Sequence, residues 1–187
     1  MKFLNPDVMC LGNHEFDLGT KGLIPFLNSI NCTVVAANLG LERSSHLKVA
    51  SNLKKSTIIS IKGTKVGIVG YLTPDTKFMS SADDVDIYPE IDYVNQEAKT
   101  LKDAGVNIII ALGHSGFERD QEIALNCPDV DFVIGGHTNT FLYNGPTPDI
   151  ERPVGPYPFV VTQPNGKRVP IVQAYAFTKY LGHIKLK

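Results

Sequence analysis

The chain has 187 residues, of which 43% are hydrophobic and 20% charged, and this balance is typical of a globular domain with a sizeable core. A net charge of −1 gives no sign of a surface for nucleic acid or anionic lipid, and no window holds the roughly 18 apolar residues that a membrane span needs. Three cysteines without a CxxC pair exclude a disulfide scaffold, and residues 1–9 lack the layout of a secretory signal.

Apolar runs alternate with helical patterns through the first two thirds of the chain. In chain order these patterns predict a strand at 8–11, a helix at 21–29 interrupted by Pro25, a strand at 33–37, a hairpin of strands 57–61 and 65–71, a helix at 93–104, a strand at 107–112, a helix at 117–126 and a strand at 130–134. The near-continuous apolar run NIIIAL at 107–112 is typical of a strand buried on both faces.

The last third of the chain differs in character. Residues 144–170 are rich in proline, which favours loops and sheet edges over central strands. Segments 159–162, 169–174 and 182–186 are predicted to be antiparallel strands. The whole order predicts one domain, in which sheets form a two-layer or sandwich arrangement with flanking helices.

Three predicted strands end in polar residues that follow a glycine. The sequences are GNHEFD at 12–17, GHS at 113–115 and GGHTN at 135–139. Ligands bind where the strands of α/β sheets end, and imidazole nitrogens and amide oxygens suit zinc or manganese. The candidate ligands are therefore Asn13, His114, His137 and Asn139. A single histidine after a strand is more often a hydrogen-bonded turn residue, but three of the five histidines share this setting.

His14 and Asp17 have a different relation. Residues three apart lie on one face of a helical turn, so the Asp17 carboxylate can accept a hydrogen bond from the His14 imidazole and orient the ring. Such a pair suits general acid catalysis beside a leaving oxygen. The alternative is an ordinary helix start, where Asp is common.

With the later stretches GGHTNTFLYNG and QAYAFTKYLGHIKL, these motifs give the chain a clear family likeness. It resembles the calcineurin-like metallophosphoesterases and, within them, the 5'-nucleotidase and apyrase family. The resemblance covers essentially the whole chain and implies an α/β fold, the four-layer αββα metallophosphoesterase domain.

The resemblance also implies a role for each candidate residue. His14 is the catalytic histidine and Asp17 its orienting partner. The metal ligands are Asn13, His114, His137 and, as the weakest match, Asn139. The family uses two divalent ions, usually zinc, with manganese, cobalt or magnesium as alternatives. A hydroxide that bridges the two ions attacks phosphorus in line.

The chain departs from the family pattern at its start. Family members carry an Asp-x-His strand end and a Gly-Asp turn upstream of GNHEFD, whereas Asp7 is the sole carboxylate among the twelve residues before Asn13. We therefore expect residues 1–187 to form a metallophosphoesterase domain that lacks its first βα unit, with the C-terminal nucleotide-binding domain absent. Two dications about 3.5–4 Å apart need an anionic bridge, so we expect one ion or none here, and no activity from this chain alone.

The implied function of the parent protein is hydrolysis of nucleoside phosphates, either AMP or, as in apyrases, ATP and ADP. The alternatives are a 2',3'-cyclic nucleotide phosphodiesterase and a non-catalytic secreted binding relative. The resemblance implies a nucleotide as partner, with no nucleic acid and no membrane span in this chain. It also implies an extracellular or cell-surface location, a lipid anchor in the parent, and a homodimer formed through the absent C-terminal domain. Asn31, in the sequon Asn-Cys-Thr, is then a candidate glycan site, although such sequons often arise by chance.

Overall fold

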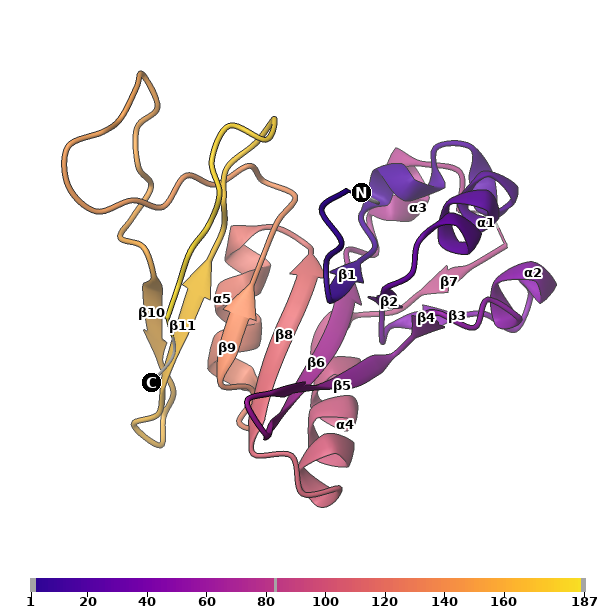
Figure 1. Ribbon diagram of the computed structural model, residues 1–187, viewed down its shortest axis with the longest axis horizontal. Helices are drawn as coiled ribbons and strands as arrows, with labels where there is room; N and C mark the ends of the chain where they lie inside the picture. Colours follow the sequence, from indigo (N-terminus) through magenta and orange to yellow (C-terminus); the bar gives the residue numbers. More distant parts are fainter. Residues whose placement is uncertain (1–2, 83, 186–187) are drawn as a thin grey trace.

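The computed structural model describes residues 3–82 and 84–185 and contains helices and three sheets (Figure 1). The strands are β1 (Val8–Cys10), β2 (Thr33–Val35), β3 (Leu39–Gly40), β4 (Leu53–Lys54), β5 (Ser56–Ile61), β6 (Thr64–Leu72), β7 (Asp86–Ile87), β8 (Ile108–His114), β9 (Phe132–Ile134), β10 (Phe159–Thr162) and β11 (Arg168–Val172). The helices are η1 (Asn13–Phe16, a 3₁₀ turn), α1 (Gly19–Ser29), α2 (Ser45–Lys48), α3 (Thr76–Met79), α4 (Glu90–Asp103) and α5 (Phe117–Asn126).

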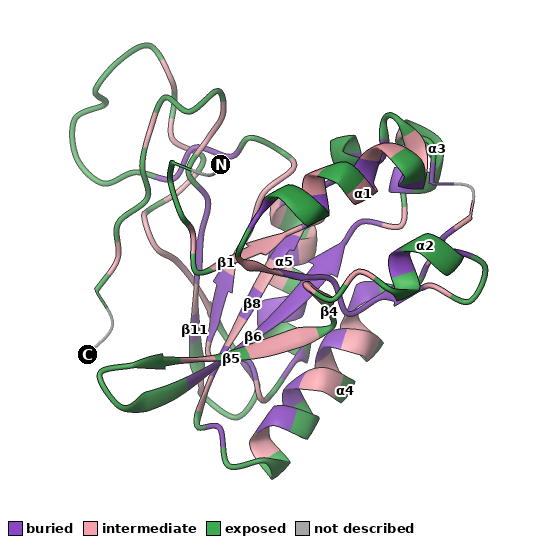
Figure 2. Ribbon diagram, turned by 45° about the vertical axis from the view of Figure 1, so that its right-hand side comes forward, coloured by how far each residue is buried: buried purple, intermediate pink, exposed green. Residues whose placement is uncertain are grey.

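The larger sheet has six strands in the order β10-β11-β9-β8-β6-β5. Strands β6, β8, β9 and β11 run parallel, while β5 and β10 pair antiparallel at the two edges. Helices α4 and α5 cover one face of this sheet, and their apolar side chains form a core with β6, β8 and β9. Strand β6 is buried from Val66 to Leu72, and β8 alternates between buried and partly buried residues, whereas the tip of the β5–β6 hairpin is exposed (Figure 2).

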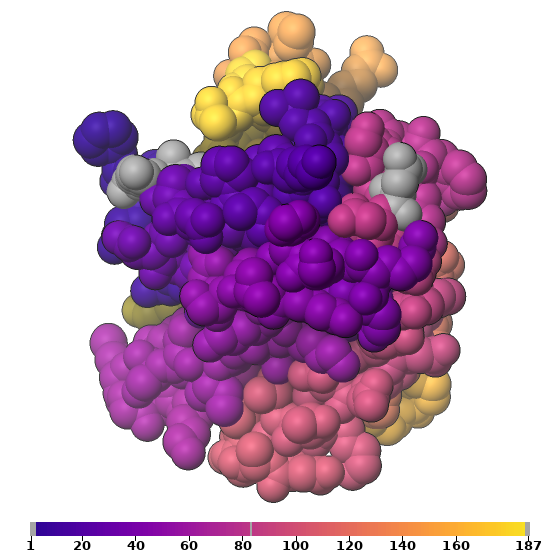
Figure 3. All heavy atoms as spheres, turned by 90° about the vertical axis from the view of Figure 1, so that its right-hand side faces the viewer, coloured from indigo at the N-terminus to yellow at the C-terminus, as the bar shows by residue number. Residues whose placement is uncertain are grey.

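The smaller sheet, in the order β1-β2-β4, packs on the other face of the larger one. The close approach depends on Gly70 in β6, because a Cβ there would lie 2.3 Å from the carbonyl oxygen of Val35. Helices α1 and α2 cover the outer side of the smaller sheet, so that N-terminal segments, coloured indigo to purple, fill the middle of the face seen in Figure 3. The layers thus run helix, sheet, sheet, helix, as the predicted αββα fold requires.

Most predicted elements are present within a few residues of their expected bounds, and two predictions are wrong. Helix α1 continues through Pro25 as a single helix, although a proline inside a helix costs about 3 kcal/mol. Its buried side chains Leu23 and Leu27 offset that cost by packing against the small sheet. Residues 182–185 form no strand with any described residue, and Leu186 lies outside the described part of the chain.

Strand pairing also differs from the expectation in one respect. Strand β11 is antiparallel to β10 but parallel to β9, so the C-terminal strands extend the main sheet and do not form a separate antiparallel unit. Among the helices of the described ranges 3–82 and 84–185, each is too short or too polar to cross a lipid bilayer.

Candidate active site

Three strand ends converge at one end of the paired sheets. Strand β1 leads into η1, which carries Asn13 and His14, and it contacts β8 across the two sheets. His114 is the last residue of β8, and His137 lies three residues after the end of its parallel neighbour β9. Parallel strands deliver their carboxyl ends to the same edge, which brings side chains more than one hundred positions apart in the sequence into contact.

Asn13, His114 and His137 form a compact cluster of donor atoms. The Oδ1 atom of Asn13 lies 2.9 Å from Nε2 of His114 and 3.2 Å from Nδ1 of His137. The two imidazole rings are 5.0 Å apart between centroids and meet edge to face at 65°. Asn13 is buried and the two histidines are half-buried, so the cluster lies at the floor of the site.

The environment of the cluster keeps His114 in its neutral form. Burial, followed by the nearby rings of His137 and His14, lowers the pKa of His114 to about 4, so its ring is neutral near pH 7. A histidine must be neutral to bind a metal, and these three donors therefore suit one divalent cation such as zinc or manganese. The described residues contain no group of three or more His, Cys, Asp or Glu side chains placed to hold a metal. The donor set thus fits one cation and supplies no carboxylate to bridge a second.

His14 and Asp17 form the hydrogen bond that their spacing predicts. Nδ1 of His14 lies 2.9 Å from Oδ2 of Asp17, and both side chains are largely exposed. Ser80, from the end of α3, donates a second hydrogen bond of 2.7 Å to Oδ1 of Asp17. The hydrogen bonds from Ser80 and then from His14 lower the pKa of Asp17, which keeps the carboxylate ionised and able to orient the ring.

The turn that carries His137 and Asn139 is strained. Both residues have positive φ angles, 76° and 52°, and a non-glycine residue in this region costs about 1–3 kcal/mol when bulky. Asn139 itself is exposed, and no hydrogen bond joins it to Asn13, His114 or His137 among the described residues, so its role as a ligand stays a prediction. Such strain persists only where neighbouring contacts hold the backbone in place.

Sequence reasoning missed two residues that support the site. Ser80 contacts Asp17 from 63 positions away, and nothing in the local sequence around Ser80 indicates this contact. Gln173 follows β11, and its side chain contacts both ends of the turn that carries His137. The sequence did offer one indication for Gln173: it is a polar residue near the end of the predicted strand 169–174. The ends of such strands contribute residues to the site.

Comparison with known proteins shows which proteins this chain is similar to. The family model for calcineurin-like phosphoesterases matches residues 1–141. A protein of Lutzomyia longipalpis is 52% identical over 187 residues, and a 5'-nucleotidase of Mus musculus is 46% identical over 189 residues. Each match covers the whole of this chain but 33% of the relative, so the chain spans about a third of the length of these proteins. The crystal structure of a 5'-nucleotidase precursor from Thermus thermophilus superposes with a TM-score of 0.87 at 36% identity, over 92% of this chain and 34% of that one.

Proposed function

The chain belongs to the calcineurin-like phosphoesterase family, and we propose that the protein hydrolyses phosphate groups from nucleotides, with AMP as its main substrate. Relatives named 5'-nucleotidase, at 44–46% identity over the whole of this chain, support the substrate class. The observation that carries the proposal is the His14–Asp17 pair, which stands beside the donor cluster of Asn13, His114 and His137.

The residues of the chain divide the chemistry between them. A divalent cation held by Asn13, His114 and His137 would polarise the phosphoryl oxygens and stabilise the charge that develops there. Asp17 holds Nδ1 of His14, which leaves Nε2 of the exposed ring directed away from the carboxylate. As a water oxygen bonds to phosphorus and the bond to the leaving oxygen breaks, His14 donates a proton from Nε2 to that departing oxygen, and a proton of the attacking water passes to solvent. Asp17 stabilises the charged ring before the transfer.

Several finer features are part of the same proposal. The imidazole and amide donors favour zinc over magnesium as the bound ion, because magnesium prefers oxygen ligands. A second ion requires carboxylates, which this cluster does not contain. An extracellular location agrees with relatives named as snake venom 5'-nucleotidases, and Asn31, which is exposed, is then a glycan site. Activity on ATP or ADP, a lipid anchor and dimerisation complete the proposal as features implied by the family.

The test uses a chimera in which residues 1–187 replace the matching segment of the Mus musculus 5'-nucleotidase, 46% identical. Phosphate release from AMP, ADP and 2',3'-cyclic AMP is measured with added zinc or manganese. We expect AMP hydrolysis that falls by about 10²–10⁴-fold in a His14→Ala variant, because a general acid contributes that much. His46→Ala is the matched control, since His46 is an exposed histidine on the distant helix α2.

The outcomes separate the candidate functions. A folded chimera that hydrolyses only the cyclic substrate would select the phosphodiesterase. A folded chimera that binds zinc but releases no phosphate would favour the non-catalytic relative. The unfused chain, assayed in parallel, is expected to be inactive because its cluster lacks a carboxylate, and hydrolysis by it would contradict that expectation.

A further inference from the structure

The buried side chain of Gln173 spans the strained turn between Gly136 and Thr140. Nε2 of Gln173 donates to the carbonyl oxygen of Gly136 over 3.1 Å, and Oε1 of Gln173 accepts from the backbone N–H of Thr140 over 3.1 Å. The carboxamide thus contacts the residue before His137 and the residue after Asn139, and both positive φ angles lie between its two contacts. Gln173 is 3% exposed, so water does not compete for these hydrogen bonds.

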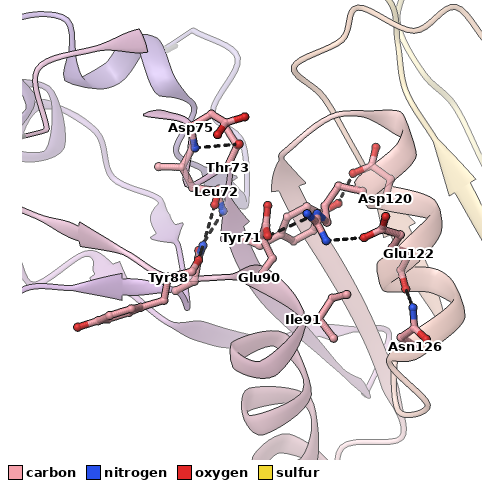
Figure 4. Close-up of polar contacts among 12 residues, drawn as sticks. Tyr71, Leu72, Thr73, Asp75, Tyr88, Glu90, Ile91, Asp120, Glu122 and Asn126 are labelled. Atoms are coloured by element: carbon pink, nitrogen blue, oxygen red, sulfur yellow. Dashed lines mark hydrogen bonds and ion pairs between the residues drawn. The ribbon is translucent and has the colours of Figure 1, made fainter. Parts of the chain in front are cut away.

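A second buried group reinforces the direction in which the carboxamide faces. Nε2 of Gln173 also donates to Oδ2 of Asp120 on α5 over 2.7 Å. The hydroxyl of Tyr71 on β6 donates to the other carboxylate oxygen of Asp120 over 2.6 Å, as Figure 4 shows. Asp120 and Tyr71 are both fully buried. The carbonyl of Gly136 can only accept and the N–H of Thr140 can only donate, so the amide nitrogen of Gln173 faces Gly136 and its oxygen faces Thr140; the contact with Asp120 reinforces this orientation.

The neighbouring glycines make room for this network. A Cβ at Gly135 would lie 1.8 Å from Oδ2 of Asp120, and a Cβ at Gly113 would lie 2.3 Å from the ring of Tyr71. Gly113 precedes His114, and Gly135 lies two residues before His137. The backbone next to both histidines therefore packs directly on the buried network.

We propose that Gln173 is a positioning residue that holds His137 against Asn13 and His114, and that Asp120 acts through it by orienting its carboxamide. The inference rests on the proposed function only in treating His137 as a metal ligand. The chain from Tyr71 to Asp120 to Gln173 links α5 and β6 to the turn, so the position of the ring is set by the core of the larger sheet. Side chains that orient metal ligands in this way strongly affect metal affinity.

The alternative is that Gln173 supports only the fold, and the chain offers a matched control for that possibility. Gln163 is also 3% exposed, and its Nε2 donates to the carbonyl oxygens of Ala124 and Cys127 over 2.8 and 3.0 Å. Those carbonyls lie at the C-terminal end of α5, whereas the donor cluster lies near the start of α5, at the carboxyl ends of the strands. Gln163→Met removes two buried hydrogen bonds and Gln173→Met removes three, both at nearly constant side-chain volume.

The first measurement needs neither metal nor nucleotide. Native-state amide hydrogen exchange is followed by NMR in the whole chain and in both variants. We expect the Thr140 amide to exchange about tenfold faster in Gln173→Met, because it loses its buried acceptor, and to be unchanged in Gln163→Met. Unchanged protection of Thr140 in Gln173→Met would overturn the proposal, and this result does not depend on whether the protein is a phosphatase.

The second measurement is calorimetric titration with zinc. Gln173→Met should bind zinc about 10- to 100-fold more weakly than the wild type, whereas Gln163→Met should bind it unchanged. Equal weakening in both variants would show that the effect comes from general loss of stability and would overturn the proposal. Should the wild type bind zinc too weakly to titrate, the titration is repeated with both variants in the chimera described above, because the exchange result alone does not report on metal binding.

A conservative variant tests the part assigned to Asp120. In Asp120→Asn the side-chain oxygen can still accept from Gln173, and the amide can donate to the hydroxyl oxygen of Tyr71. Asp120→Ala removes the acceptor altogether. We expect Thr140 protection close to that of the wild type in Asp120→Asn and faster exchange in Asp120→Ala. Loss of protection in both variants, or in neither, would contradict the role of Asp120 as the group that orients Gln173.

Discussion

Asn13 and His14 are neighbours in the sequence but belong to two different parts of the site. Asn13 is 2% exposed and joins His114 and His137, whereas the side chain of His14 is 78% exposed and pairs with Asp17. Consecutive residues of a 3₁₀ turn point about 120° apart, so η1 sends one side chain to the floor and the next to the rim. The turn thus separates an uncharged cluster that suits a cation from an exposed pair that contains a carboxylate.

The comparison shows how one short turn serves two kinds of chemistry. Burial keeps His114 free of an extra proton, as its lowered pKa shows. Exposure and the hydrogen bond from Ser80 keep Asp17 ionised beside His14. Each environment suits its residues and would impair the other group: a buried Asp17 would tend to take up a proton, and an exposed His114 would lose the burial that keeps it neutral.

The largest expected effect is on zinc affinity, when the donor cluster and the His14–Asp17 pair are each removed by a separate substitution. Asn13→Ala removes the oxygen shared by both imidazoles and should weaken zinc binding by at least about 10- to 100-fold. His14→Ala should leave zinc affinity within about twofold, because the exposed ring pairs with Asp17 and has no hydrogen bond to the cluster among the described residues. Calorimetric titration of both variants measures this, and equal losses in the two would contradict the separation.

A smaller effect should appear in the pH dependence of stability. The pKa of His114 is about 4 in the folded chain, against an ordinary value of 6.5. Between these two pH values His114 is protonated in the unfolded chain but not in the folded one. The stability of the fold therefore falls as the pH falls through this window. Burial raises the pKa of Asp120 from 3.8 to about 7, so the folded chain binds the extra proton and this contribution falls as pH rises. The two residues therefore oppose one another between about pH 4 and 6.5.

Variants of Asp120 and His114 should separate the two opposing contributions to the pH dependence of stability. Asp120→Asn should make stability rise more steeply with pH, and His114→Asn should make it rise less steeply. Each change in slope is at most about 1.4 kcal/mol per pH unit, and solvent screening reduces it further for the half-buried His114. Urea unfolding of the metal-free chain across the window measures the slopes, and identical slopes in all three proteins would refute the assignment.

The smallest effect is expected at Ser80. Ser80→Ala removes one hydrogen bond to Asp17, which should raise the pKa of that carboxyl towards its ordinary value. In the chimera, the acid limb of the profile of kcat/KM against pH should shift to higher pH, with a loss of about two- to fivefold near neutrality. Ser29→Ala is the control, since this exposed serine bonds only to the backbone of its own helix. An unshifted profile would show that Ser80 does not act through Asp17.

Local sequence patterns were enough to predict much of the fold. The run NIIIAL became β8, the helix at 117–126 was placed at its observed bounds, and the 62–64 turn joins two antiparallel strands. The errors arose where distant contacts outweigh local preference. Pro25 lies inside a continuous helix because packing holds it there, and residues 182–185 lack a strand partner among the described residues.

For the site, the sequence by itself determined the residue types, their place after glycine at strand ends, and the His14–Asp17 pair, because a spacing of three on one turn is a local property. Only the tertiary structure decided that the oxygen of Asn13 meets both His114 and His137, and that Gln173 spans the turn between Gly136 and Thr140. Those contacts join positions up to 124 residues apart. They depend on the strand order and on burial, which no local pattern in the sequence specifies.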